Sequence, residues 1–411
     1  MTYPSASLTV NAVDYYESFQ CLGAQCPDTC CQGWDIPVQD SIRDLYLAHD
    51  ATHGTELAKS LIATDQGALM QFADSGYCPH LNSERLCGIY TEIGPHGQSS
   101  ICDTYPRGGI HYQLPQVELT TSLSCPVSVD AGIFREAPLR RKQIETSDPE
   151  RLALSQIQCG DQAVFAYLKA VRDLFIELLQ LREVSMNRRL MAVLLICHRF
   201  RAADYQGDMA QLTALRQQLE GLLATKLADM PELPANQANQ FGVLVELSKA
   251  LILNIKQGRY AGADANQQLL AIFDASFAGL GVQNFDALAA DHTQMYVAAQ
   301  QAYVNPWLEQ HSHIIENLFV HHFMSVGFPF TSGDSIVQQL LVPVINNLVI
   351  FGLLGGYAHR QGGLTDEMVK KQIYLFSRAI NHNRDMKSAL VNACQQLGSL
   401  EPGQLYTLVA R

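Results

Sequence analysis

The sequence predicts a mainly α-helical protein in which a loop-rich, cysteine-rich N-terminal domain precedes an all-helical domain. Two observations support this division. Eight of the eleven cysteines fall within the first 125 residues, and this part of the chain is also rich in Gly, Pro and short polar turns. From about residue 150 the sequence changes to long stretches rich in Ala, Leu, Gln and Arg. We therefore expect a cysteine-cluster domain over residues 1–135 and an all-helical domain over residues 145–411.

The N-terminal region has room only for short elements. We expect modest helices over residues 41–47 and 56–72 and a short strand over residues 112–120. A region dominated by loops folds more readily around a metal centre, because the free energy of metal binding becomes free energy of folding. The basic stretch at residues 135–142 (REAPLRRK) is expected to be a linker with a solvated turn.

The C-terminal region shows helical periodicity with clear breaks. Leu168, Val171, Phe175 and Leu178 share one apolar helix face, which predicts a helix over residues 161–182. The glycine-rich run at residues 352–363 lacks the strand–helix surroundings of a nucleotide-binding loop, so we expect a helix end with a turn. Further helices are predicted over residues 186–204, 208–228, 236–256, 263–279, 287–326 with a break near Pro306, 335–358, 365–382 and 384–397.

Length and charge exclude several classes of protein. The chain has 411 residues, of which 47% are hydrophobic and 17% charged, unlike a disordered chain. Residues 1–130 carry 4 Lys and Arg against 15 Asp and Glu, which is −11 of the formal net charge of −12. A nucleic-acid-binding protein would show a basic face, so we expect no nucleic-acid partner. The acidic region suits a cationic partner instead.

The sequence also predicts where the protein resides. Residues 1–20 contain no basic segment and no continuous apolar run, so we expect no secretory signal and a cytoplasmic protein. No stretch reaches the roughly 20 apolar residues that span a bilayer. Residues 340–357 come nearest, but Pro343, two asparagines and three glycines interrupt them, which predicts a buried helix and no membrane span.

The N-terminal cysteines are spaced like metal ligands. In a reducing compartment, clustered thiols are more often ligands or catalytic groups than disulfides. An all-thiolate set suits either zinc or an iron–sulfur centre. Two centres, or one iron–sulfur cluster with additional thiols, both fit the number of cysteines, whereas Cys159, Cys197 and Cys394 lie in apolar helical contexts and are expected to be buried. The predicted ligands are Cys21, Cys26, Cys30, Cys31, Cys78, Cys87, Cys102 and Cys125.

These cysteine blocks resemble those of the flagellin lysine-N-methylase family, within a wider group of proteins with zinc- or iron-chelating cysteine clusters. The resemblance lies in the blocks around Cys26-Pro-Asp-Thr-Cys30-Cys31, Cys78-Pro-His-Leu, Leu86-Cys87-Gly-Ile-Tyr, Ile101-Cys102-Asp-Thr-Tyr-Pro-Arg and Ser124-Cys125-Pro, and more loosely in residues 316–330 and 376–382. It implies transfer of methyl groups from S-adenosylmethionine to flagellin lysines, with an iron–sulfur cluster, of the 4Fe-4S type, in the cysteine region. Zinc remains the alternative metal.

Lysine methylation requires a neutral amine, whose reference pKa is about 10.4. Carboxylates near the amine would raise this pKa, so the acidic surface is expected to dock the substrate and not to activate it. Tyr105, Tyr90 and His111 are candidate catalytic groups by their proximity to the cysteine blocks. Arg107 is a candidate to bind a carboxylate of the methyl donor, and Trp34 to stack on its adenine.

Each of these side chains also has an ordinary structural interpretation. The tyrosines can be packed aromatics, His111 a surface histidine, Arg107 a partner of an acidic group, and Trp34 a core residue over the metal site. His311, His313, His321 and His322 lack a metal-binding motif and are expected to be packed or solvated. Two other functions remain open for the whole chain, a non-enzymatic metal-binding adaptor and a redox protein.

Overall fold

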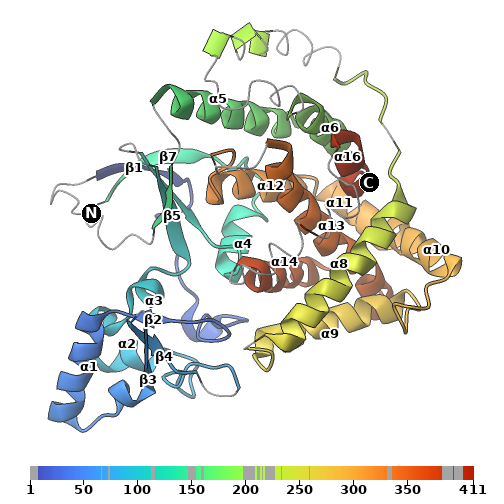
Figure 1. Ribbon diagram of the computed structural model, residues 1–411. Coiled ribbons are helices and arrows are strands. Elements are labelled where there is room, and N and C mark those ends of the chain that lie inside the picture. Colours follow the sequence, from blue (N-terminus) through green and yellow to red (C-terminus); the bar gives the residue numbers. More distant parts are fainter. Residues whose placement is uncertain are drawn as a thin grey trace.

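The computed structural model contains a larger helical body and a smaller N-terminal lobe (Figure 1). Two predicted helices, over residues 208–228 and 384–397, lie almost wholly outside the described residues, as do Cys159 and Cys394. The described residues are 8–65, 67–72, 75–112, 116–146, 154–158, 162–197, 209–210, 213–214, 216–217, 227–232, 234–258, 260–330, 336–381, 392 and 401–411.

A five-stranded sheet joins the two parts of the molecule. Its order is β7-β1-β6-β5-β8, with β1 parallel to β6, β5 parallel to β8, and the other two pairs antiparallel. The buried side chains of this sheet, such as Val10, Ile110 and Leu119, share one hydrophobic core with the helices. The strands are β1 (Leu8–Val13), β5 (Arg107–Tyr112), β6 (Val117–Thr121), β7 (Arg141–Thr146) and β8 (Leu154–Ile157).

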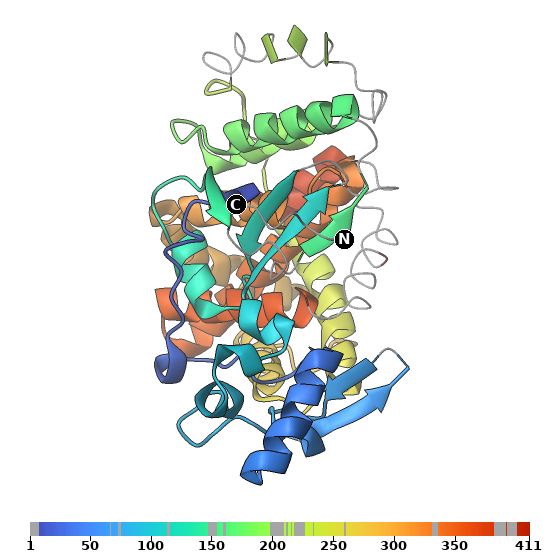
Figure 2. The ribbon, with the colours of Figure 1, turned by 90° about the vertical axis from the view of Figure 1, so that its left-hand side faces the viewer.

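The cysteine-rich lobe is an insertion between strands β1 and β5 of that sheet. It has its own small core around Ile36, Tyr46, Met70 and Ile89 and lies below the sheet in both Figure 1 and Figure 2. Its elements are β2 (Pro37–Val38), α1 (Asp40–His53), β3 (Leu61–Thr64), β4 (Gly67–Met70), α2 (Gly88–Glu92) and α3 (Ser100–Thr104). Helix α4 (Pro126–Gly132) follows β6 and contributes Val129 to the larger core.

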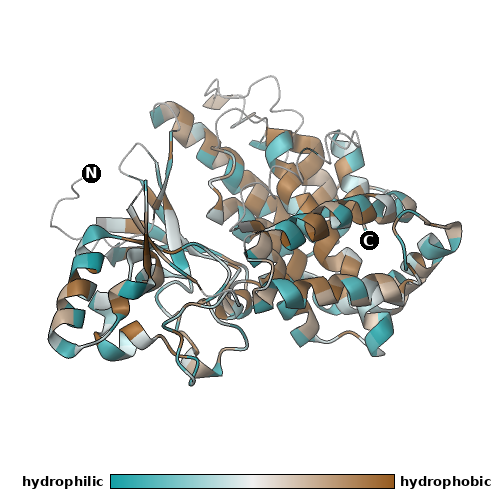
Figure 3. Cartoon of the chain, turned by 60° about the horizontal axis from the view of Figure 1, so that its bottom comes forward, coloured by the Kyte–Doolittle hydropathy of each residue, from teal (hydrophilic) through white to brown (hydrophobic). Residues whose placement is uncertain are grey.

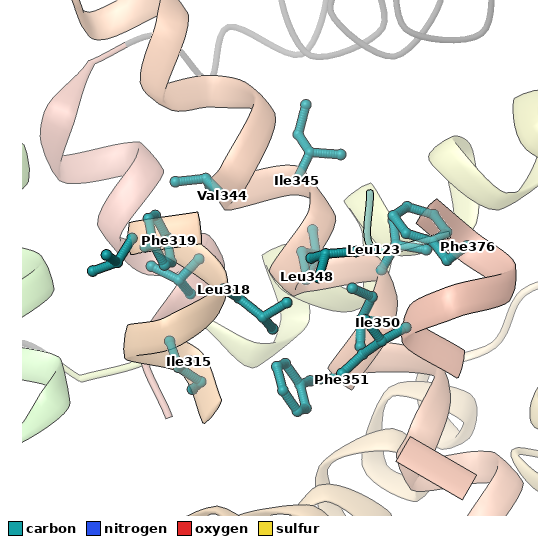
Figure 4. Packing of buried hydrophobic residues seen from close by; sticks show 14 of the residues in the cluster. Leu123, Ile315, Leu318, Phe319, Val344, Ile345, Leu348, Ile350, Phe351 and Phe376 are labelled. Carbon is teal, nitrogen blue, oxygen red and sulfur yellow. The ribbon is translucent and has the colours of Figure 1, made fainter. Parts of the chain in front are cut away.

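The larger body consists of helices packed around α13. Figure 3 shows hydrophobic residues concentrated on its central helices, and Figure 4 shows Leu318, Phe319, Leu348 and Phe351 packed where α12 and α13 meet. The helices are α5 (Gln162–Leu179), α6 (Met186–Cys197), α8 (Gln237–Gln257), α9 (Asp264–Gly279), α10 (Ala290–Ala299), α11 (Asn305–Gln310), α12 (His313–Ser325), α13 (Ile336–Gln361), α14 (Asp366–Asn381) and α16 (Pro402–Val409).

The structure agrees with a mainly helical chain but differs from the prediction in several places. The second region is not all-helical, because β7 and β8 belong to the sheet. The predicted helix over residues 287–326 is four elements, since a π-helical turn at Gln300–Val304 separates α10 from α11 and α12 follows separately. Helix α16 was not predicted. Residues between Trp34 and Cys102 contribute a hydrophobic cluster of their own, and the domain boundary between residues 135 and 145 stays a prediction.

The basic stretch at residues 135–142 is not a solvated linker. Arg141 begins strand β7 and forms a buried ion pair with Glu118 of β6. Arg172 of α5 binds the same carboxylate through two nitrogens, at 2.8 and 2.6 Å. Arg135 pairs with Asp14, just after β1. These basic side chains therefore link neighbouring parts of the sheet to one another and link the sheet to the helices.

Two close approaches fix the packing of α9 against α13. The Cα atoms of Gly279 and Gly356 face the neighbouring backbone so closely that a Cβ on Gly356 would lie 2.1 Å from the carbonyl oxygen of Ser276. Among the described residues, α13 is also the one helix long and apolar enough to cross a membrane, and 83% of its most apolar window is buried inside the protein. It is the helix that the sequence predicted to be buried.

Candidate functional site

Five of the eight N-terminal cysteines line a single cavity of about 70 Å³ in the small lobe, together with Trp34, Tyr46 and Tyr105. The backbone brings them together from distant segments. The amide of Cys78 donates to the carbonyl of Cys31 at 2.9 Å, and the hydroxyl of Ser99 caps helix α3 by accepting from the amide of Cys102 at 3.4 Å. The five thiols are Cys30, Cys31, Cys78, Cys87 and Cys102.

Three of these thiols, Cys30, Cys78 and Cys102, have raised pKa values, which favours their protonated form when no cation is bound. Burial raises the pKa values of Cys78 and Cys102 to about 12. A side-chain hydrogen bond with Cys31 raises the pKa of Cys30 well above its usual value. Metal ligation requires thiolates, so loading such a site releases protons and depends on the charge of the metal centre.

The two expected metal centres need different spacings of the thiols. In a tetrahedral zinc site with Zn–S bonds of about 2.3 Å, the sulfur atoms stand about 3.8 Å apart. Among the described residues, no three His, Cys, Asp or Glu side chains converge in a way that holds one metal ion. A four-iron cluster takes one cysteine per iron, which spreads the sulfur atoms farther apart. The cavity offers five thiols in a largely apolar lining that also includes Gln98 and Ser99.

The other three predicted ligands do not line this cavity. Burial raises the pKa of Cys26 to about 11, and negative charge on Cys125 and Cys21 contributes to the same shift. Cys21 is exposed, whereas Cys125 is buried at the start of α4. The eight N-terminal thiols thus fall into a group of five around the cavity and a group of three outside it.

A larger cleft of about 600 Å³ lies beside the thiol cavity, between the sheet and helices α12, α13 and α14. Trp34 and Tyr105 line both spaces. Their ring centroids are 5.3 Å apart, so this aromatic pair forms the wall between the thiols and the cleft. The volume is within the range of about 300–1,000 Å³ that is typical of small-molecule sites.

The structure brings Arg107, Trp34 and Tyr105 together in this cleft. Arg107 is held in place because its Nη2 donates to the carbonyl of Phe19 at 3.1 Å and its guanidinium stacks 4.9 Å from the centre of the Phe19 ring. The indole nitrogen of Trp34 donates to the carbonyl of Cys30 at 2.7 Å. The hydroxyl of Tyr105 forms a 3.0 Å hydrogen bond with Ser124, and burial raises its pKa.

The two other candidate catalytic groups lie elsewhere. Tyr90, on α2, has 53% of its surface exposed and lines neither the cleft nor the thiol cavity. His111 is half-buried on β5, where its Nδ1 lies 3.1 Å from Oε1 of Gln156. Both positions are close to the cysteine blocks in sequence, but strand β5 and helix α2 direct them away from the cleft.

Of the four histidines in residues 311–322, two line the cleft. His321 is buried, and its Nε2 lies 3.0 Å from the carbonyl oxygen of Thr121, to which it donates. Burial lowers its pKa to about 4, so it is neutral at pH 7. His322 is the second. His311 instead stacks on Trp307, with ring centroids 4.2 Å apart.

The sequence predicts that the helical region shapes the substrate cleft, but it did not single out the polar residues of this wall. Asn346 and Asn347 of α13 and Ser377 of α14 line it, with His322 of α12. These residues form no sequence motif, because they come from three helices that loops separate. The looser similarity over residues 316–330 and 376–382 was the one signal that pointed to this wall.

A buried ion pair fastens the cysteine loop to the helices. Arg378 of α14 lies 2.7 Å from the carboxylate of Asp28 and donates to the carbonyl of Thr29 at 2.8 Å. On the other side of the loop, the side chain of Gln32 accepts from the amide of Ala265, at the start of α9, at 3.1 Å. The lobe that carries the thiols is therefore held against the body that carries the cleft.

Comparisons with known proteins agree with this architecture. A family model described as the FliB lysine N-methylase C-terminal domain matches residues 172–408, which include all three helices of the cleft wall. Two proteins named Lysine-N-methylase, from Salmonella choleraesuis (strain SC-B67) and Salmonella typhimurium (strain LT2), are each 23% identical over 398 residues, covering 92% of this chain and 93% of each relative.

A third relative matches a shorter part of the chain. The flagellar biosynthetic protein FliU of Salmonella muenchen is 31% identical over 125 residues, which is 29% of this chain and 73% of that protein. No solved structure matches. Because the family model spans more than half of the sequence, the chain belongs to the FliB lysine N-methylase family.

Proposed function

We propose that the protein is a cytoplasmic protein-lysine N-methyltransferase that transfers methyl groups from S-adenosylmethionine to lysine side chains of flagellin. The observation that carries this proposal is the cleft of about 600 Å³, in which Arg107 and Trp34 meet beside the thiol cavity. The relatives named Lysine-N-methylase, which align over 92% of the chain, support the reaction. The flagellar names of its relatives support flagellin as the substrate.

The cleft offers complementary groups for the methyl donor. S-adenosylmethionine combines an adenine ring, a sulfonium and an amino-acid carboxylate. The guanidinium of Arg107 would pair with the carboxylate, and its fixed position on Phe19 reduces the entropy lost on binding. The indole of Trp34 would stack on the adenine. Neither role needs the glycine-rich loop of doubly wound methyltransferases.

The thiol cavity would hold the iron–sulfur cluster. Cys30, Cys78, Cys87 and Cys102 approach it from separate segments, and Cys31 supplies a fifth thiol. A cluster bound there would supply redox-active iron beside the aromatic wall of the cleft. The protein's own part is to position the thiols, exclude water with Trp34 and Tyr105, and hold the donor on the other side of that wall.

The acidic N-terminal lobe would attract the substrate. Residues 1–130 hold −11 of the net charge of −12, which favours association with lysine-rich surfaces and makes it sensitive to salt. The charge is on the lobe that borders the cleft, so a lysine would be guided toward the entrance.

The test is methylation by anaerobically purified protein. Incubation with S-adenosylmethionine and flagellin should add methyl groups to lysine, detected by mass spectrometry, and omission of the donor should abolish the gain. Absence of methylation together with absence of donor binding would overturn the proposal in favour of a metal-binding adaptor. Iron and sulfide analysis tests the cluster separately: Cys78→Ser should lower the iron content, whereas Cys197→Ser, a buried thiol in α6, should retain it.

A further inference from the structure

The lining of the cleft differs in charge from the surface around it. The described residues that line it include no Asp, Glu or Lys, and Arg107 is the one permanently charged side chain among them. Yet the first 130 residues, which supply the sheet side of the cleft, carry 15 acidic residues. Within the part of the chain that the structure describes, the acidic side chains therefore lie outside the cleft.

The titratable groups that face the cleft add no negative charge. Tyr105 comes from the turn before β5, Arg107 from β5, and His321 and His322 from α12, whereas the lining residues of α13 and α14 are uncharged. Burial raises the pKa of Tyr105, which keeps the phenol neutral. Burial also lowers the pKa of His321 to about 4.

The rest of the lining combines polar side chains with apolar ones from the helices and from the turn after β6. Leu123, Ile350 and Phe376 lie close together in Figure 4, and all three line the cleft. A lysine ammonium that enters this space loses water and meets no carboxylate from the described lining residues. Desolvation and a nearby positive charge both favour the neutral amine.

We propose that this carboxylate-free cleft is itself the activating device, which admits the substrate lysine as its neutral amine so that methyl transfer needs no dedicated general base. This inference rests on the proposed function and adds to it how the amine becomes reactive. Arg107 would be paired with the donor's own carboxylate, so the sulfonium is the unpaired positive charge that the amine meets. Behind the lining, Arg378 is paired with Asp28 and Arg141 with Glu118. A drop of about 3 units from the reference pKa of about 10.4 would make roughly half of the bound amine neutral near pH 7.4.

The reaction step is balanced without another co-reactant. The lone pair of the amine nitrogen forms a bond to the methyl carbon while the carbon–sulfur bond breaks. The electron pair of that bond stays on sulfur, which leaves as a neutral thioether. The positive charge passes to nitrogen, and the methylated ammonium loses its extra proton to water when it leaves the cleft.

The experiment places a carboxylate in the cleft and measures kcat against pH with both substrates saturating, because kcat reports ionisations in the bound complex. Asn346→Asp puts the charge on α13, and Ser377→Asp puts it on α14 across the cleft. Their matched controls are Asn346→Ala and Ser377→Ala. The controls should keep the wild-type midpoint of the kcat profile, whatever their effect on its height.

Both Asp variants should move that midpoint upward by at least about one pH unit, because an opposite charge within about 4–6 Å stabilises the ammonium. At pH 7.5, kcat should fall about tenfold below that of the matched Ala variant and recover at higher pH. Ser377→Lys should shift the midpoint the other way, so the proposal stays testable even if one Asp variant misfolds.

The outcomes separate the two proposals. If the wild type methylates flagellin and the Asp profiles coincide with the Ala profiles, the activating role of the cleft is wrong and the methyltransferase function stands. If the wild type does not methylate lysine with either flagellin or a lysine peptide, both proposals are overturned.

Discussion

The Glu118→Gln substitution tests whether a buried charge cluster holds the sheet to helix α5. Glu118 and Arg172 are 3% and 2% exposed, and the guanidinium binds both carboxylate oxygens. The hydroxyl of Tyr112 donates to the same carboxylate at 2.9 Å, and Arg141 pairs with it from β7. Glutamine preserves the shape of the side chain but leaves two buried guanidinium groups without their anion.

The expected cost follows from the ionisation of Glu118. Arg141 and Arg172 lower its pKa from 4.5 to about 2 against the opposing effect of burial. At 1.36 kcal/mol per unit, this shift corresponds to about 3 kcal/mol. Breaking a buried ion pair by removing one partner costs a similar 3–5 kcal/mol in general. Because the native pKa is the lower one, this stability is complete above about pH 5 and is lost as the pH falls toward 2.

Urea unfolding followed by circular dichroism measures this cost. With a slope of about 3 kcal/mol per molar urea, the midpoint at pH 7 should fall by about 1 M for Glu118→Gln. Glu145→Gln, at an exposed position on β7, is the control and should change it little. The reasoning would be refuted if the two variants had equal midpoints, or if the difference between wild type and Glu118→Gln did not shrink between pH 5 and pH 2.

Three further substitutions test other parts of the structure by the same unfolding assay. His321 has a native pKa of about 4, below its usual 6.5, so its contribution to stability is complete above pH 6.5 and is lost as the pH falls toward 4. His321→Gln still donates to the Thr121 carbonyl and should remove that part of the acid sensitivity. An unchanged pH profile of stability would count against the role of His321. Arg378→Met should cost about 3–5 kcal/mol because Asp28 stays buried without its cation, and adding Asp28→Asn should restore part of the loss; equal losses would contradict the ion pair. Gly356→Ala should destabilise by about 1–3 kcal/mol, since its Cβ would meet the Ser276 carbonyl at 2.1 Å, whereas Gly242→Ala on the open face of α8 should stabilise by up to about 1 kcal/mol.

The helices could be predicted because their signal is local. The periodic apolar face of α5 and the breakers after α9 and α13 lie within single segments of the chain. The five-stranded sheet depends instead on pairing between distant segments, such as Asn11 with Glu118. Strands of four to six residues give weak periodicity, and the pairing of two distant strands produces no pattern within either segment of the sequence. The burial of Arg141 was missed for the same reason, since its partner lies on another strand.

The candidate site was predictable on one side only. Trp34, Tyr105 and Arg107 stand within or beside the cysteine blocks, so the motif similarity led to them. Asn346 and Ser377 are ordinary polar residues in long helices, and no spacing distinguishes them from surface positions. Proximity in sequence also suggested Tyr90 and His111, which the structure places outside the cleft. Spatial neighbourhood, and not sequence distance, decides which polar side chains share the cavity.

The position of the cysteine lobe between β1 and β5 has a consequence for how the protein is assembled. Ala12 pairs with Leu119, and Leu119 pairs with Gly109, so the lobe leaves and re-enters the sheet at the same level, two strands apart. At about 4.8 Å per strand, its two ends are about 10 Å from each other. The sheet and the helices can therefore close whatever the lobe holds. A short linker in place of residues 20–105 should leave the rest of the protein folded, so the lobe behaves as a module that could be exchanged without redesigning the sheet.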